Sequence, residues 1–106
     1  MSQPNAGLAL AIAILVSVTN SDLERALSIG RSSDRARTTF HSRYVVTLEG
    51  PTVEQIEVLT EFRRAVVVVE QRALAGDRMF GLGQLAAAVR PFHNQVTIRA
   101  RPAWIR

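Results

Sequence analysis

Residues 52–76 read TVEQIEVLTEFRRAVVVVEQRALAG, and they contain the longest helix that the sequence predicts. Thr52 and Gln55 have the spacing of a capping box, in which side chains satisfy unpaired backbone N–H groups at a helix start. Behind them, large apolar residues recur every three or four positions from Leu59 to Ala73, which is the spacing of one helix face. Gly76 is a natural helix end. We therefore expect one continuous helix over residues 52–75.

A run of β-branched residues within this segment argues against the helix. Residues 65–69, Ala-Val-Val-Val-Val, are poor helix formers and are more typical of strands. A strand there would have to follow a helix directly, because no Gly, Pro, Asn or Asp lies between Val53 and Ala75. We therefore retain the single helix.

The apolar segment at residues 8–18 carries no charge. Its odd positions are mostly small, whereas its even positions are all large: Leu8, Leu10, Ile12, Ile14, Val16 and Val18. This period of two predicts a central strand that is covered on both faces. The alanines also favour a buried helix. We prefer the strand, but both interpretations stay open, and the topology depends on the choice. The segment is too short for a bilayer, which needs about 20 apolar residues, and we expect no membrane partner.

Shorter elements complete the predicted fold. Ser21 and Glu24 form a second capping box, with Gly30 as a left-handed C-cap and a polar loop behind it. Alternating residues predict strands, and residues 82–90 have the spacing of a short helix. The expected class is α+β: a small three-stranded mixed sheet (strands near 8–18, 38–49 and 95–101), packed by a long helix (52–75) and two short helices (22–29 and 82–90).

Length and composition set limits on the class of protein. The chain has 106 residues, which fits a single domain over residues 1–106. It has no cysteine, which excludes disulfides, thiol nucleophiles and thiolate metal sites. A cytoplasmic location is compatible with that absence.

Every basic residue of the chain except its two histidines is an arginine, and the net charge is +4. Arginine binds phosphate through two parallel hydrogen bonds, which suggests nucleic acid as a partner. A genome rich in G and C, which favours Arg codons, explains the same bias without any ligand. The charge surplus lies in residues 77–106, with five arginines against one acid. If the polar loop meets the last strand in space, the candidate phosphate-binding residues are Arg35, Arg37, Arg99 and Arg101.

No catalytic, metal-binding or cofactor-binding pattern occurs in the sequence. His41 and His93 lie in no His-x-x-His or His-Glu-x-x-His motif. The segment Gly81-Leu82-Gly83 lacks the third glycine and the lysine of a nucleotide-binding loop, and is expected to be a flexible joint. We therefore expect no enzyme activity, no catalytic residues and no cofactor.

The C-terminal residues Trp104, Ile105 and Arg106 form the candidate interface. Trp and Arg are the residues most enriched at the energetic centres of protein–protein interfaces. Trp104 can instead fold back into the core of its own chain, and both alternatives stay open.

Three functions are compatible with this sequence. The leading hypothesis is a non-enzymatic structural or protein–protein interaction subunit that self-associates, with itself or another protein as its partner. The alternative is a small basic nucleic-acid-binding protein that contacts phosphates through its arginines. The third is a small enzyme whose ferredoxin-like sheet forms a pocket only at a dimer interface.

Overall fold

The computed structural model describes residues 18–102, which form four α-helices, one short 3-10 helix and three strands. The predicted α+β class is confirmed. In chain order the elements are α2 (Asn20–Gly30), α3 (Asp34–Ser42), β1 (Val45–Thr47), β2 (Val53–Leu59), α4 (Glu61–Leu74), α5 (Leu82–Val89), η1 (Arg90–Phe92) and β3 (Thr97–Pro102).

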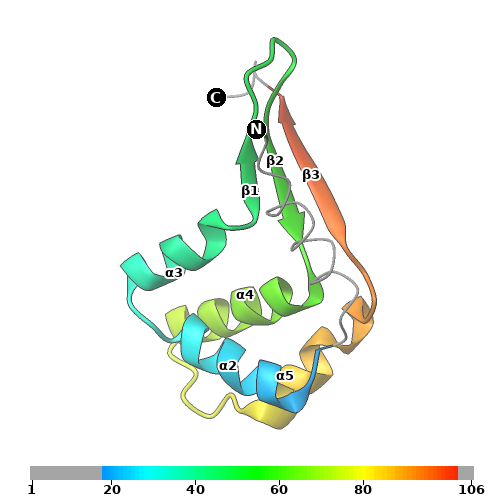
Figure 1. The fold of residues 1–106 in the computed structure, drawn as a ribbon. Helices are drawn as coiled ribbons and strands as arrows, with labels where there is room; N and C mark the ends of the chain where they lie inside the picture. The colour runs from blue at the N-terminus through cyan, green and yellow to red at the C-terminus, as the bar shows by residue number, and fades with distance from the viewer. Residues whose placement is uncertain (1–17, 103–106) are drawn as a thin grey trace.

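The described part of the chain has two structural regions. Helices α2, α4 and α5 pack together at one end, and the three strands project from them as a narrow sheet (Figure 1). Helix α3 connects α2 to the sheet. The strand order is β1-β2-β3 and both pairings are antiparallel. The described residues form three strands, but they are not the three that were predicted: β2 was predicted as helix, and residues 8–17 lie outside the described structure. The sheet is antiparallel and not mixed, because β1 and β2 form a hairpin and β3 returns beside β2.

The single helix predicted over residues 52–75 is wrong in its first half. Residues Val53–Leu59 are the central strand, and the helix begins only after Thr60. Thr60 makes this change possible in one residue: its backbone is extended (φ −82°, ψ 167°) and its side chain accepts a hydrogen bond from the Arg63 N–H. The β-branched run stays helical, and its members Val66 and Val69 lie in the core.

The strand predicted over residues 38–49 is also largely wrong. Only Val45–Thr47 is a strand, and Asp34–Ser42 is a helix whose N-cap, Ser33, accepts a hydrogen bond from the Ala36 N–H. The misleading signal was the period of two shared by Phe40 and Tyr44. Two residues four apart also share a helix face, and these two rings lie 5.2 Å apart between centroids.

The remaining predicted elements are confirmed, with small shifts at their ends. The helix expected at 22–29 is α2, which begins two residues earlier because the capping box uses Thr19 and Asp22 in place of Ser21 and Glu24. The helix expected at 82–90 is α5, and the strand expected at 95–101 is β3. The strand expected at residues 8–18 lies outside the described residues except for Val18.

Two glycines have clear structural roles. Gly76 has a φ of +76° just beyond α4, so the predicted helix end is confirmed. Gly30 is the last residue of α2 and does not act as a left-handed C-cap. A Cβ atom on Gly30 would lie 2.5 Å from the Cβ of Val69, which shows that glycine allows α2 and α4 to approach closely.

The hydrophobic core lies among α2, α4 and α5, with Phe40 of α3 at its side. Its largest fully buried side chains are Leu85, Val66 and Val69. Since the strands contribute only Val58 and Leu59 to the buried apolar residues, most of the burial is in the helices.

Candidate functional site

The two candidate phosphate-binding residues of β3 are paired with carboxylates of the neighbouring strand. Arg99 lies directly opposite Glu57 in the register, with 3.6 Å between Nη1 and Oε1. Arg101 Nη2 lies 3.3 Å from Oε2 of Glu54. A phosphate would have to compete with these acids, which partly neutralise the positive charge of the strand.

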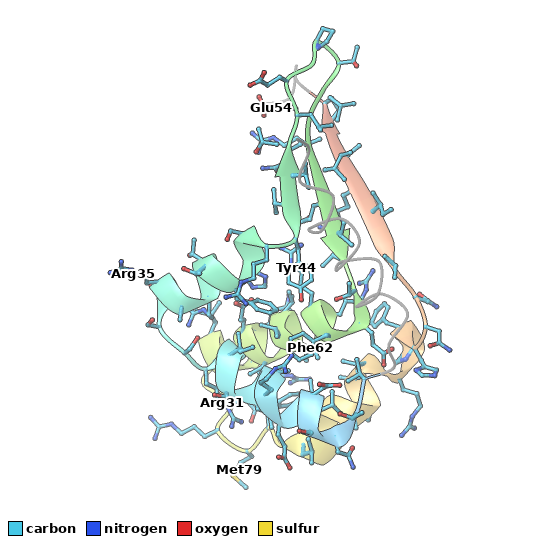
Figure 2. All side chains as sticks on the ribbon, in the orientation of Figure 1. Arg31, Arg35, Tyr44, Glu54, Phe62 and Met79 are labelled. Carbon is cyan, nitrogen blue, oxygen red and sulfur yellow. The ribbon has the colours of Figure 1, made fainter. Side chains whose placement is uncertain are left out.

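The other two candidates lie on α3 and differ from each other. Arg37 pairs with Asp34, and its Nε lies 3.6 Å from Oε2 of Glu70. Arg35 extends from the first turn of α3 into solvent (Figure 2). Helix α3 and strand β3 lie on opposite sides of β1 and β2 (Figure 1). The four arginines therefore do not gather into one patch in the described part of the chain.

The predicted interface residues Trp104, Ile105 and Arg106 lie outside the described residues. Their role stays a prediction.

A buried arginine that sequence reasoning missed lies where the helices meet the sheet. The side chain of Arg63 is only 7% exposed. It donates to the Val58 carbonyl oxygen (3.1 Å) and to Nδ1 of His41 (3.0 Å), and it pairs with Glu57 (2.9 Å). A buried charge is stable when it is paired and hydrogen-bonded in this way. Arg63 therefore joins α4 to both β2 and α3.

The helical register contained a signal for this cluster. Arg63, Val66 and Glu70 are three and four residues apart, so they share one face of α4. When two charged residues share a helix face with a buried valine, they indicate a polar contact at the edge of the core. The predicted helix over residues 52–75 already contained this face, but the partners Glu57 and His41 were missed because β2 was predicted as helix and α3 was largely predicted as strand.

His41 is held at both ring nitrogens by this cluster. Its Nδ1 accepts from Arg63, and its Nε2 lies 2.8 Å from Oε2 of Glu70. Since an arginine N–H can only donate, Nδ1 is the acceptor in its contact with Arg63, and Nε2 faces the Glu70 carboxylate. A histidine acting as a general base needs a lone pair that can reach the substrate, and the Nδ1 lone pair is already bound to Arg63.

A second histidine–carboxylate contact lies at the turn before β3. His93 Nδ1 is 3.4 Å from Oε1 of Glu61, and the same carboxylate accepts from the backbone N–H of Asn94 at 3.2 Å. Asn94 has a left-handed backbone (φ 58°). Glu61 therefore ties the first turn of α4 to the turn that leads into β3.

Two side chains near the helix starts have shifted acidities. Burial raises the pKa of the Tyr44 phenol above its usual value, although the hydrogen bond with Thr60 and the positive charge of Arg63 oppose the change. The backbone N–H of Thr19 donates to Asp22 and lowers the pKa of that carboxyl. Tyr44 precedes β1, so its phenol lies at the junction of the helices and the sheet (Figure 2).

One face of the sheet is apolar and largely open. Side chains directly opposite each other in an antiparallel register point to the same face. We use the term apolar sheet face for the side chains that the register places together: Val46, Ile56, Val58, Ile98 and Ala100. Ile98 is 66% exposed and Val46 is 49% exposed, whereas Val58 is buried at the base of the sheet.

Comparisons of the chain with protein-family models, with curated proteins and with solved structures found no match. Within residues 18–102 no three His, Asp or Glu side chains are grouped as they would be to hold a metal ion. Over the same residues, none of the helices has the length and hydrophobicity needed to span a membrane.

Proposed function

We propose that the chain is a non-enzymatic interaction subunit that self-associates by packing its apolar sheet face against the same face of a second copy. The observation that carries this proposal is the exposure of two large aliphatic residues, Ile98 and Val46, on the two edge strands of one face, with Ile56 of β2 between them. Contiguous exposed apolar surface marks interaction sites on proteins.

The distribution of charge over the sheet supports a second copy as the partner. The residues of the apolar sheet face carry no charge, and Arg99 and Glu57 pair on the opposite face. This surface offers no ion pair to a charged partner. The same face of a second copy is apolar over the same area and can pack against it. A two-fold axis would place each Ile98 against the partner's apolar sheet face.

The non-enzymatic part of the proposal is supported by the contacts of the histidines. Arg63 occupies the Nδ1 lone pair of His41, and Glu61 of α4 contacts His93 in the turn before β3. Both rings therefore hold parts of the fold together.

Light scattering coupled to size-exclusion chromatography tests this proposal with the full-length chain. Because the face is small, we expect weak association: the mass should rise from one copy toward two as the loading concentration increases roughly a hundredfold. Ile98→Glu should hold the protein at the mass of one copy, since a buried unpaired charge is costly. Met79→Glu is the matched control, because Met79 is 85% exposed but lies in the loop before α5.

Two results would overturn the proposal. One is a wild-type mass of one copy at every concentration. The other is a dimer that Ile98→Glu and Met79→Glu affect equally.

A further inference from the structure

A groove of about 540 Å³ runs between the C-terminal end of α2 and one side of α3. We call it the α2–α3 groove. Ile29, Ala36 and Phe40 form its apolar part, and four Ser or Thr hydroxyl groups lie along it. It is separate from the apolar sheet face, and neither the proposed self-association nor the Arg63 cluster uses it.

The charge of the α2–α3 groove is entirely positive. Two arginines line it, Arg35 near the start of α3 and Arg43 at its C-cap, and no Asp or Glu does. They are eight positions apart in the chain, which is about 12 Å along the axis at 1.5 Å per residue. Arg35 reaches into solvent (Figure 2), and within the described residues neither guanidinium has a carboxylate within ion-pairing distance.

An apolar groove whose two arginines are unpaired within the described residues matches the surface of an acidic amphipathic helix. Such a helix lays an apolar stripe into an apolar groove and anchors it through residues one or two turns apart. Carboxylates seven or eight residues apart on that helix are about 10–12 Å apart, which is close to the axial separation of Arg35 and Arg43. The Ser32 hydroxyl already donates to the Ile29 carbonyl oxygen. The other three hydroxyl groups along the groove can donate further hydrogen bonds to the acidic side chains.

Residues 1–17 and 103–106 do not match the acidic helix that the groove requires. These two segments lie outside the described structure and contain no Asp or Glu. A single-stranded nucleic acid fits less well, because its bases need aromatic faces for stacking. The one aromatic ring in the groove, Phe40, is only 7% exposed and packs against Phe62 and Tyr44.

We infer that the α2–α3 groove is a docking site for an acidic amphipathic helix of a partner protein, with Arg35 and Arg43 contacting its carboxylates.

Fluorescence anisotropy with a labelled 18-residue helical peptide tests this inference on the full-length chain. The peptide carries Leu at one-turn spacing on one side and Glu along both flanks of that stripe, and a second peptide has Lys in place of every Glu. We expect the Glu peptide to bind at least about tenfold more tightly than the Lys peptide and to weaken as salt is added.

Variants of the protein locate the binding site. Arg35→Gln with Arg43→Gln should weaken binding of the Glu peptide about five- to tenfold, the loss of two partly exposed ion pairs. Ala36→Trp, at an exposed position, should block the groove and abolish binding with both arginines retained. Arg78→Gln with Arg90→Gln is the control, since these exposed arginines lie outside the groove and should leave the affinity unchanged. Circular dichroism verifies that each variant is folded.

The inference is overturned if the Glu peptide does not bind, if the Lys peptide binds equally well, or if the control pair causes the same loss as the groove pair. Displacement of the Glu peptide by a dT15 oligonucleotide at equal concentration would assign the groove to nucleic acid instead.

Discussion

The helices and the sheet of this protein bury their side chains very differently. Leu85 and Val66 in the helices are completely buried, whereas Ile98, the second residue of β3, is 66% exposed. The same kind of aliphatic residue therefore stabilises the fold in one region and remains available to a partner in the other. This difference indicates that the helices supply most of the stability and that the sheet exposes an apolar surface for a partner.

The two regions are joined by a small number of polar contacts. Arg63 bonds to the Val58 carbonyl oxygen and Glu57 of β2, and to His41 of α3. Glu61 binds the turn that leads into β3. Arg64 also donates to the Thr97 hydroxyl of β3. The sheet is thus held to the helices by two arginines and a carboxylate from the first turn of α4, in addition to the buried Leu59.

The largest expected effect is a loss of stability in the helices. Leu85→Ala should lower the free energy of unfolding by about 3–4 kcal/mol, because it leaves a cavity at a fully buried position. Ile98→Thr should change it by less than about 0.5 kcal/mol, since the residue is exposed and Thr suits a strand. Urea unfolding measured at a concentration where the protein is monomeric gives both values. If both variants lose the same free energy of unfolding, the helices do not supply more of the stability than the sheet.

The junction should show the next largest effect. Arg63→Met preserves the apolar part of the side chain but removes the closest partner of Glu57 and the donor to His41 Nδ1, so that Glu57 keeps only Arg99 and His41 keeps only Glu70. We expect a loss of about 2–3 kcal/mol, at the low end for a broken buried pair because Glu57 keeps some contact with water. Arg72→Met is the matched control on the same helix, since the side chain of Arg72 is 55% exposed. The same urea experiment measures both variants, and a loss for Arg63→Met no larger than that of the control would show that the junction contributes little.

The elements that were predicted correctly are those whose sequence signals lie within a few residues of one another. Helices α2 and α5 and strand β3 follow from helix-capping residues, from short apolar repeats and from alternation, all of which act within a few residues. The end of α4 followed from Gly76 for the same reason.

The boundary between β2 and α4 depends on distant residues and was missed. Thr52 and Thr60 both look like helix N-caps, and the residues between them can be helix or strand. What selects the strand is pairing with β1 and with residues 97–102, about 40 positions later. No local pattern contains that information.

The contacts of the candidate site were missed for the same reason, because they join residues far apart in the sequence. The pairing of Arg99 with Glu57 is set by a register between strands about 40 residues apart. From the sequence alone Arg99 was predicted to be available for phosphate. Only the strand register shows that a carboxylate lies beside it. The α2–α3 groove was missed because residues 38–44 were assigned to a strand.

A smaller effect is expected where α2 and α4 approach each other. Gly30→Ala places a methyl group 2.5 Å from the Cβ of Val69, and we expect a loss of about 1–2 kcal/mol, less than full overpacking because Ala favours helix. The double variant with Val69→Ala sharpens the test. If the clash is the cause, Gly30→Ala should cost much less in that background, and an unchanged cost would assign the effect to the backbone.

The smallest effect concerns Tyr44, the only tyrosine of the chain. Burial raises its pKa in the folded protein, so the folded state holds the phenolic proton at pH values where the unfolded chain has lost it. Its contribution to stability is therefore complete below about pH 10, the pKa of an unperturbed tyrosine, and is lost as the pH rises through the higher folded value. Absorbance at 295 nm during an alkaline titration reports this one residue. We expect a midpoint above that of the urea-unfolded chain, and a weaker loss of stability with rising pH in Tyr44→Phe. A folded midpoint equal to the unfolded one would mean that the phenol is solvated, and that the sheet and the helices are less closely packed at Tyr44 than the structure shows.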